Sequence, residues 1–172
     1  MTQTRILIMI AIAFVYFSCT RNSSGPNEDF SIPTDDEMPK IYYSGNNHQN
    51  EKINYDLILE KGIANFIGFN YELQKVTEEH TIALPIFMWH DLRKTTNIEQ
   101  LFKVTMDPRC GNFMEFINLE IDSIETGFGY SLSAPLEKIP EQINGATESV
   151  LGFVQQLRII DNYCYQKVSN RD

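Results

Sequence analysis

The chain has 172 residues, of which 23 are acidic and 14 are basic, so its formal net charge at pH 7 is −9. An acidic chain without clustered Lys and Arg argues against nucleic acid as a partner, and against a basic patch that binds anionic lipid. The length suits one domain, and the Phe, Tyr, Ile and Leu residues after about residue 53 are enough for an apolar core.

The N-terminal stretch RILIMIAIAFVYFSC, from Arg5 to Cys19, is a mostly apolar run that follows one positive charge. The twelve residues from Ile6 to Phe17 are too few for a helix that crosses a bilayer, which needs about 20. A basic residue, a short apolar run and a small residue before a cleavage point are typical of a secretory signal peptide. We therefore predict that residues 1–18 are removed, which leaves 13 basic and 23 acidic residues and a net charge of −10.

The four residues Tyr16-Phe17-Ser18-Cys19 resemble the lipobox of bacterial lipoprotein precursors. In that family a diacylglyceryl group joins the cysteine sulfur, the preceding peptide is cut away, and the new amino terminus is acylated, typically with palmitate. Two or three acyl chains make such an attachment stable, whereas one chain alone binds reversibly. The resemblance implies lipidation at Cys19, with a plain secreted protein and an uncleaved anchor as alternatives.

The same resemblance implies a location in the cell envelope, with the membrane as a partner through the N-terminal lipid and the domain facing the periplasm or the exterior. Thr20 follows the cysteine, which is similar to the outer-membrane pattern, because aspartate is the typical retention signal at that position. The outer membrane is therefore favoured over the inner membrane.

The chain has three cysteines, and an unpaired thiol is unfavourable in an oxidising compartment. If Cys19 carries lipid, Cys110 and Cys164 remain, and we predict a disulfide between them. Closing that loop would stabilise the fold by roughly 4 kcal/mol in the chain-entropy model. The alternative is that both are small buried apolar side chains.

Residues 19–52 are rich in acids and turn formers, which predicts a flexible tether with a root-mean-square reach of roughly 30 Å. The aromatic segment with Tyr42 and Tyr43 is the exception. It is expected either to dock on the domain as an edge strand or to bind a partner.

Residues 53–172 are predicted to form a single globular domain that begins with a helix over 54–73, where apolar residues recur at spacings of three and four. Thr81–His90 is rich in β-forming residues, and its Pro85 predicts an edge or bulged strand. A short helix is expected over Asn97–Met106.

The second half of the domain has a clear strand at Phe113–Asp122, and residues 128–132 are its expected partner across a turn. Ser149–Ile160 has helical spacing and is predicted to cover the strands, although an extended form is an alternative, and NYCYQKV is predicted as a last strand. The fold class is therefore α+β, a small antiparallel sheet packed against two or three helices.

We find no convergent catalytic pattern, no zinc signature and no phosphate-binding glycine pattern, so the sequence predicts no cofactor and no metal and favours a protein without enzymatic activity. His80 and His90 are ten residues apart, which no tight zinc signature uses. Four carboxylates could supply an acid and a base, or calcium ligands, but their spacing favours a solvated strand face: Glu115, Glu120, Asp122 and Glu125.

The segment FMWHDLR combines Trp89 with His90 and Arg93, and Trp and Arg are residue types that dominate protein interfaces. If Trp89 is exposed, these residues are a partner-binding site, with Tyr42 and Tyr43 as a second one. If Trp89 is buried, it belongs to the core.

Three functional classes fit these observations. The first is a lipid-anchored, non-catalytic binding module, such as an immunity-type protein that neutralises a cationic toxin. The second is a structural or assembly lipoprotein of the envelope, and the third is an envelope hydrolase with an unrecognised site.

Overall fold

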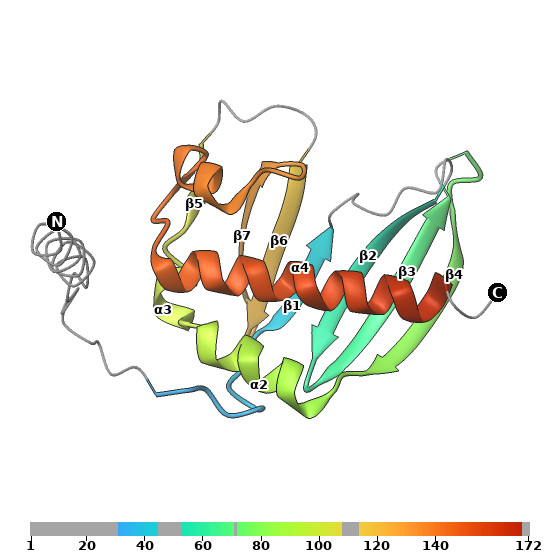
Figure 1. The fold of residues 1–172 in the computed structure, drawn as a ribbon, viewed down its shortest axis with the longest axis horizontal. Coiled ribbons are helices and arrows are strands. Elements are labelled where there is room, and N and C mark those ends of the chain that lie inside the picture. Colours follow the sequence, from blue (N-terminus) through green and yellow to red (C-terminus); the bar gives the residue numbers. More distant parts are fainter. Residues whose placement is uncertain (1–30, 45–52, 71, 108–113, 170–172) are drawn as a thin grey trace, which may run out of the picture. The chain divides into compact units, whose positions relative to one another are not determined.

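The computed structural model describes residues 31–44, 53–70, 72–107 and 114–169 of the chain (Figure 1). The described residues belong to one compact unit that begins at Ser31. The predicted signal peptide, Cys19 and Cys110 lie outside the described residues.

The centre of the fold is a six-stranded sheet in which every neighbouring pair is antiparallel, with the strand order β4-β3-β2-β1-β6-β7. Its strands are β1 (Lys40–Ser44), β2 (Ile53–Glu60), β3 (Ile63–Asn70), β4 (Lys75–Ala83), β6 (Met114–Ile121) and β7 (Ile124–Ser131). A second, two-stranded sheet pairs β5 (Thr105–Met106) with β8 (Ile143–Asn144).

The helices are α2 (Ile86–Thr95), α3 (Ile98–Leu101), the 3-10 helix η1 (Leu136–Glu141) and α4 (Glu148–Ser169). The long helix α4 crosses one face of the sheet, with α2 beside it on the same side (Figure 1). Antiparallel strands with helices on one face confirm the predicted α+β class.

Helix α4 confirms the helix predicted over Ser149–Ile160 and extends nine residues beyond it, through Ser169. The predicted last strand NYCYQKV is therefore wrong. Asp161, Cys164 and Val168 are buried and continue the spacing of three and four residues, so the sheet-facing stripe of the helix does not end at Ile160.

The predicted helix over residues 54–73 is also wrong, because this segment forms the β2–β3 hairpin. Tyr55, Leu57 and Leu59 are buried in alternation, as a strand with one covered face requires. The hairpin turns at Lys61 and Gly62, whose φ angles are 47° and 77°. Two successive positive φ angles are the geometry of a tight hairpin turn, so Gly62 is a turn residue here.

The strand predicted over Thr81–His90 ends at Ala83 and begins earlier, at Lys75. It lies at the sheet edge, as expected. The remainder is helical, because Pro85 stands directly before the first turn of α2, where its missing N–H costs nothing. His80 therefore lies within β4, and His90 lies on α2.

The segment with Tyr42 and Tyr43 is a central strand, although we expected a tether with at most an edge strand. β1 pairs with β2 on one side and with β6 on the other. The sheet therefore begins at Lys40, before the domain boundary drawn at residue 53. Ile41 and Tyr43 point into the core, and pairing on both sides fixes the strand.

The β6–β7 hairpin confirms the predicted strand pair, and β7 begins at Ile124, earlier than expected. Only part of the helix predicted over Asn97–Met106 forms. The Asn97 side chain accepts a hydrogen bond of 3.1 Å from the Gln100 N–H and caps α3, which ends at Leu101. Thr105 and Met106 form the short strand β5 instead.

Candidate functional site

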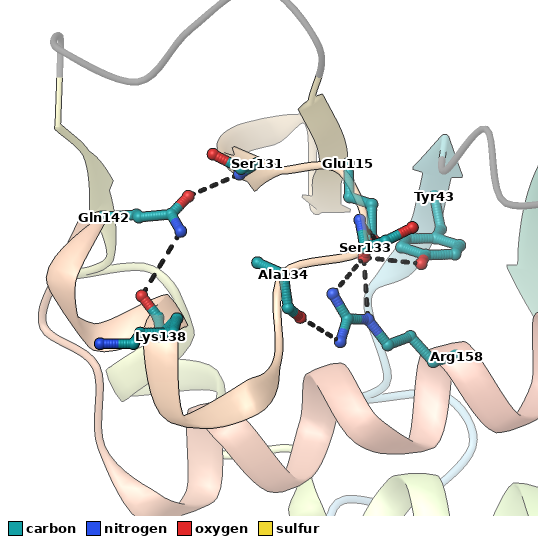
Figure 2. Close-up of polar contacts among 8 residues, drawn as sticks. All are labelled: Tyr43, Glu115, Ser131, Ser133, Ala134, Lys138, Gln142 and Arg158. Atoms are coloured by element: carbon teal, nitrogen blue, oxygen red, sulfur yellow. Dashed lines mark hydrogen bonds and ion pairs between the residues drawn. The ribbon is translucent and has the colours of Figure 1, made fainter.

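A buried carboxylate lies between the sheet and α4. Glu115 on β6 has no exposed surface. Its Oε2 accepts a hydrogen bond of 3.0 Å from the Tyr43 hydroxyl and one of 2.9 Å from Arg158 Nε, and its Oε1 accepts one of 2.9 Å from the Ser133 N–H (Figure 2). Arg158 Nη2 lies 2.9 Å from the same Oε2 as an ion pair. We name Glu115, Arg158, Tyr43 and Ser133 the buried clamp.

The solvated face that we expected for Glu115 is therefore wrong at this position. Glu115 is in register with Tyr130 and lies on the same side of β6 as Ile117 and Leu119, which face the core. A carboxylate has about four acceptor sites, and three hydrogen bonds and an ion pair converge on this one. A substrate proton or a calcium ion would have to displace those donors, so the clamp is built to hold the fold together.

Arg158 connects α4 to the segment that follows β7. Its Nη1 donates a hydrogen bond of 2.7 Å to the Ala134 carbonyl, and its guanidinium lies 5.3 Å from the centroid of the Tyr130 ring. Next to this contact, Gln142 accepts a hydrogen bond of 2.6 Å from the Ser131 N–H and donates one of 3.4 Å to the Lys138 carbonyl (Figure 2). These contacts fix the end of β7 to η1 and α4.

Two buried tyrosines, Tyr43 of the buried clamp and the neighbouring Tyr130, remain neutral at physiological pH. Burial, followed by the neighbouring Tyr130 and Glu115, raises the pKa of Tyr43 far above its usual range. Burial and the charge of Glu115 raise the pKa of Tyr130 in the same way, and among the described residues its hydroxyl has no hydrogen-bond partner. Neither phenol is suited to act as a base.

Trp89 is buried, so the core alternative of the sequence interpretation holds for this residue. Its indole Nε1 donates a hydrogen bond of 2.9 Å to Asp35 Oδ1. Arg93 donates from Nε to the Pro33 carbonyl at 2.7 Å and pairs with Asp35 at 3.0 Å. These two residues of α2 fasten residues 33–35 to the domain, whereas His90 is exposed on the same helix.

The sheet has a second face, which points away from α4, and no helix in the described part of the chain lies on it (Figure 1). We call it the open face. Open antiparallel faces are normally polar, because they contact water. Here several large apolar side chains are only half-buried on it or are exposed: Tyr42, Ile58, Ile63, Ile67, Phe69 and Phe116.

The charged residues of the open face are mostly carboxylates. Alternation along the described strands places five acids on this face against one lysine, Lys40: Asp56, Glu60, Glu79, Glu120 and Glu125. Glu120 stands directly opposite Glu125 in the β6–β7 register, and like charges in that position repel. From the neighbouring strand β1, the Tyr42 hydroxyl donates a hydrogen bond of 3.2 Å to Glu120 Oε2.

A third cluster lies near the β4 edge. Glu78 Oε2 accepts a hydrogen bond of 3.0 Å from the Tyr55 hydroxyl and lies 3.4 Å from His80 Nε2. His80 and His90 are on separate elements and do not form one site. Within the ranges that the structure describes, no group of three His, Cys, Asp or Glu residues is placed to hold a metal ion.

The chain matches no protein-family model, and no curated protein matches it. Of the helices in the described residues, none has both the length and the apolar character that a membrane span requires.

Sequence reasoning missed both faces of this sheet as sites. The buried clamp had one signal, an acidic residue at an inward position of the predicted strand 113–122. The open face had a signal only on β6 and β7, where Glu120 and Glu125 fitted a solvated strand face. Most of its other residues come from β1, β2 and β3, which we expected to be a tether and a helix.

Proposed function

We propose that this chain is a lipid-anchored protein of the cell envelope whose domain acts as a non-catalytic binding module. The observation that carries the proposal is the open face, where half-buried apolar side chains are surrounded by carboxylates and no described helix covers them. The lipid anchor rests on the lipobox-like residues before Cys19.

The occupant that fits the open face best is a protein surface that carries Lys or Arg. Five carboxylates against one lysine give this face a local charge of about −4, and complementary charge directs association. Apolar side chains at the centre of a patch with charges around it are also the usual composition of a protein interface. An immunity-type protein that neutralises a cationic toxin is the specific form of this proposal.

The alternatives have less support. The hydrolase would need an accessible acid or base, yet the most deeply buried carboxylate is occupied by three hydrogen bonds and an ion pair. The assembly lipoprotein depended on an aromatic tether segment that binds a partner, and this segment is a central strand. Tyr43 is buried there, and only Tyr42 contributes to a surface.

A photo-crosslinking side chain at Asn65, in the middle of β3 on the open face, tests the proposal in the native envelope. Gln155, which is exposed on α4, is the matched control position. We expect a protein adduct from position 65 and none from position 155. The partner in that adduct should carry a basic surface, because the open face is acidic.

Charge variants make this test specific. Glu120→Gln with Glu125→Gln removes two negative charges from the open face, and Glu137→Gln with Glu148→Gln removes two from exposed positions elsewhere. We expect about a tenfold loss of the adduct from the first pair only. Equal loss from both pairs, or no adduct at position 65, would contradict the binding function.

The anchor has its own test. Cys19→Ser should move the protein out of the detergent phase, because serine has no sulfur to which the lipid can be joined. Unchanged partitioning would remove the lipid anchor and leave the binding function to be judged by the crosslinks.

A further inference from the structure

The first turn of α2 presents two adjacent large apolar side chains to solvent. Ile86 is 89% exposed and Phe87 is 62% exposed, and the next residues of the helix, Met88 and Trp89, turn inward. Adjacent exposed apolar side chains of this size indicate a surface that contacts something other than water.

These side chains lie at the edge of the domain where the described chain begins. Trp89 and Arg93 hold residues 33–35 against α2, so the first described residues of the chain run alongside this helix (Figure 1). Ile63 opens β3 at the same edge, opposite Ala83 at the end of β4, and is 44% exposed. Ile32, three residues before Asp35, is 42% exposed.

The length of chain before this edge limits which part of the domain can touch a membrane. Ser31 follows Cys19 by 12 positions. Twelve residues span at most roughly 40 Å when fully extended, and a flexible chain of that length averages about 20 Å. A domain of this size is about 30 Å across. The average reach is shorter than the domain is wide, so a lipid on Cys19 favours orientations in which the edge near Ser31 faces the bilayer.

Most charges of α2 and of the segment held against it are paired, and the further carboxylate of that segment, Glu37, accepts a hydrogen bond of 2.7 Å from the Thr34 N–H. Asp35 pairs with Arg93 at 3.0 Å, Asp36 pairs with Lys61 at 2.7 Å, and Asp91 pairs with Lys94 at 3.3 Å. This balance distinguishes the edge from the open face. A zwitterionic lipid surface is not repelled by paired charges, so the acidity of the chain does not oppose contact here.

We infer that Ile86 and Phe87 insert into the surface of a zwitterionic phospholipid bilayer and hold the lipid-anchored domain against it by this edge. The inference rests on the lipid anchor of the proposed function. Contact by this edge leaves the open face to the side, where a protein partner has access to it.

A benzophenone side chain in place of Phe87 tests the inference directly. Leu73, which is 60% exposed in the turn between β3 and β4, at the opposite end of β3 from Ile63, is the matched control position. The full lipidated chain is reconstituted in vesicles of phosphatidylcholine and phosphatidylethanolamine and irradiated. Its intact mass is then measured by mass spectrometry. We expect a gain of one phospholipid mass at position 87 and at least a fivefold lower yield at position 73.

Each other outcome overturns the inference. Equal phospholipid adducts at both positions would mean that the tethered domain tumbles freely. A doubled chain mass would mean that a second copy covers Phe87, and no adduct would mean that nothing does. The mass before irradiation separates this failure from that of the proposed function: a chain without lipid at Cys19 removes the anchor itself, whereas a lipidated chain without adducts removes only the docking.

Discussion

Two neighbouring tyrosines of β1 donate hydrogen bonds to two glutamates of β6 on opposite faces of the same sheet. Tyr43 donates to Glu115 at 3.0 Å in the core, and Tyr42 donates to Glu120 at 3.2 Å on the open face. The first glutamate also contacts Arg158, whereas the second faces another glutamate, Glu125. The same pair of residue types therefore stabilises the fold on one face and leaves two adjacent carboxylates at the surface on the other.

The largest effect is expected from Arg158→Met, which removes the cation from the buried clamp. Breaking a buried ion pair leaves an uncompensated charge and costs about 3–5 kcal/mol of unfolding free energy. Because Glu115 is fully buried, we expect a loss in that range, measured by urea unfolding. Lys103→Met is the control, because it breaks an exposed pair with Glu99, where about 0.5 kcal/mol or less is expected. Similar losses in the two variants would show that the clamp does not stabilise the fold.

A smaller effect separates the two tyrosines. Tyr43→Phe removes one donor from the buried Glu115 and should cost about 1–3 kcal/mol in the same urea experiment. Tyr42→Phe should cost less than about 1 kcal/mol, because water can replace the lost donor at Glu120. If Tyr42→Phe proves the more costly of the two, the assignment of the faces is reversed.

The smallest expected effect is on alkaline stability. Burial, followed by the charge of Asp161, raises the pKa of the Cys164 thiol from 9.0 to about 12. Between these values the unfolded chain loses the thiol proton and the folded chain keeps it, so stability falls as the pH rises from about 9 toward 12. By pH 10 we expect a loss on the order of 1 kcal/mol, measured from urea midpoints at pH 8 and pH 10.

Cys164→Ala should flatten this pH dependence, although it lowers the stability at pH 8 by leaving a small cavity. An unchanged slope would mean that the thiol does not contribute to alkaline unfolding.

The elements that the sequence predicted well depend on neighbouring residues in the chain. In β6, Ile117 and Leu119 alternate with polar positions, and in α4, Val150, Phe153 and Leu157 repeat at helical spacing. Each pattern fits only one kind of element. The α+β class followed from these segments.

The elements that were missed depend on pairing between distant segments. The apolar residues between Asn54 and Leu73 fit helical spacing and strand alternation equally well. The turn at Lys61 and Gly62 makes the segment a hairpin. β1 is short and follows a polar stretch, so only its pairing with β6, more than 70 residues away, makes it a central strand.

The sites show the same division. Trp89, His90 and Arg93 were singled out from residue type alone, and the structure uses two of them to hold residues 33–35. Glu115 was assigned to water because its core partners lie far away in the sequence, at Tyr43 and Arg158. The disulfide stays a prediction: Cys164 is a buried free thiol in the described residues, and Cys110 lies outside them.

The central position of β1 has a mechanical consequence for a protein held by its N-terminal end. β1 is hydrogen-bonded to β2 along one side and to β6 along the other. If the proposed lipid anchor at Cys19 holds the chain, tension through residue 31 would first load the contacts of residues 33–35 with α2 and then β1, whose two ladders would carry the load together. An edge strand in the same place would peel away one bond at a time.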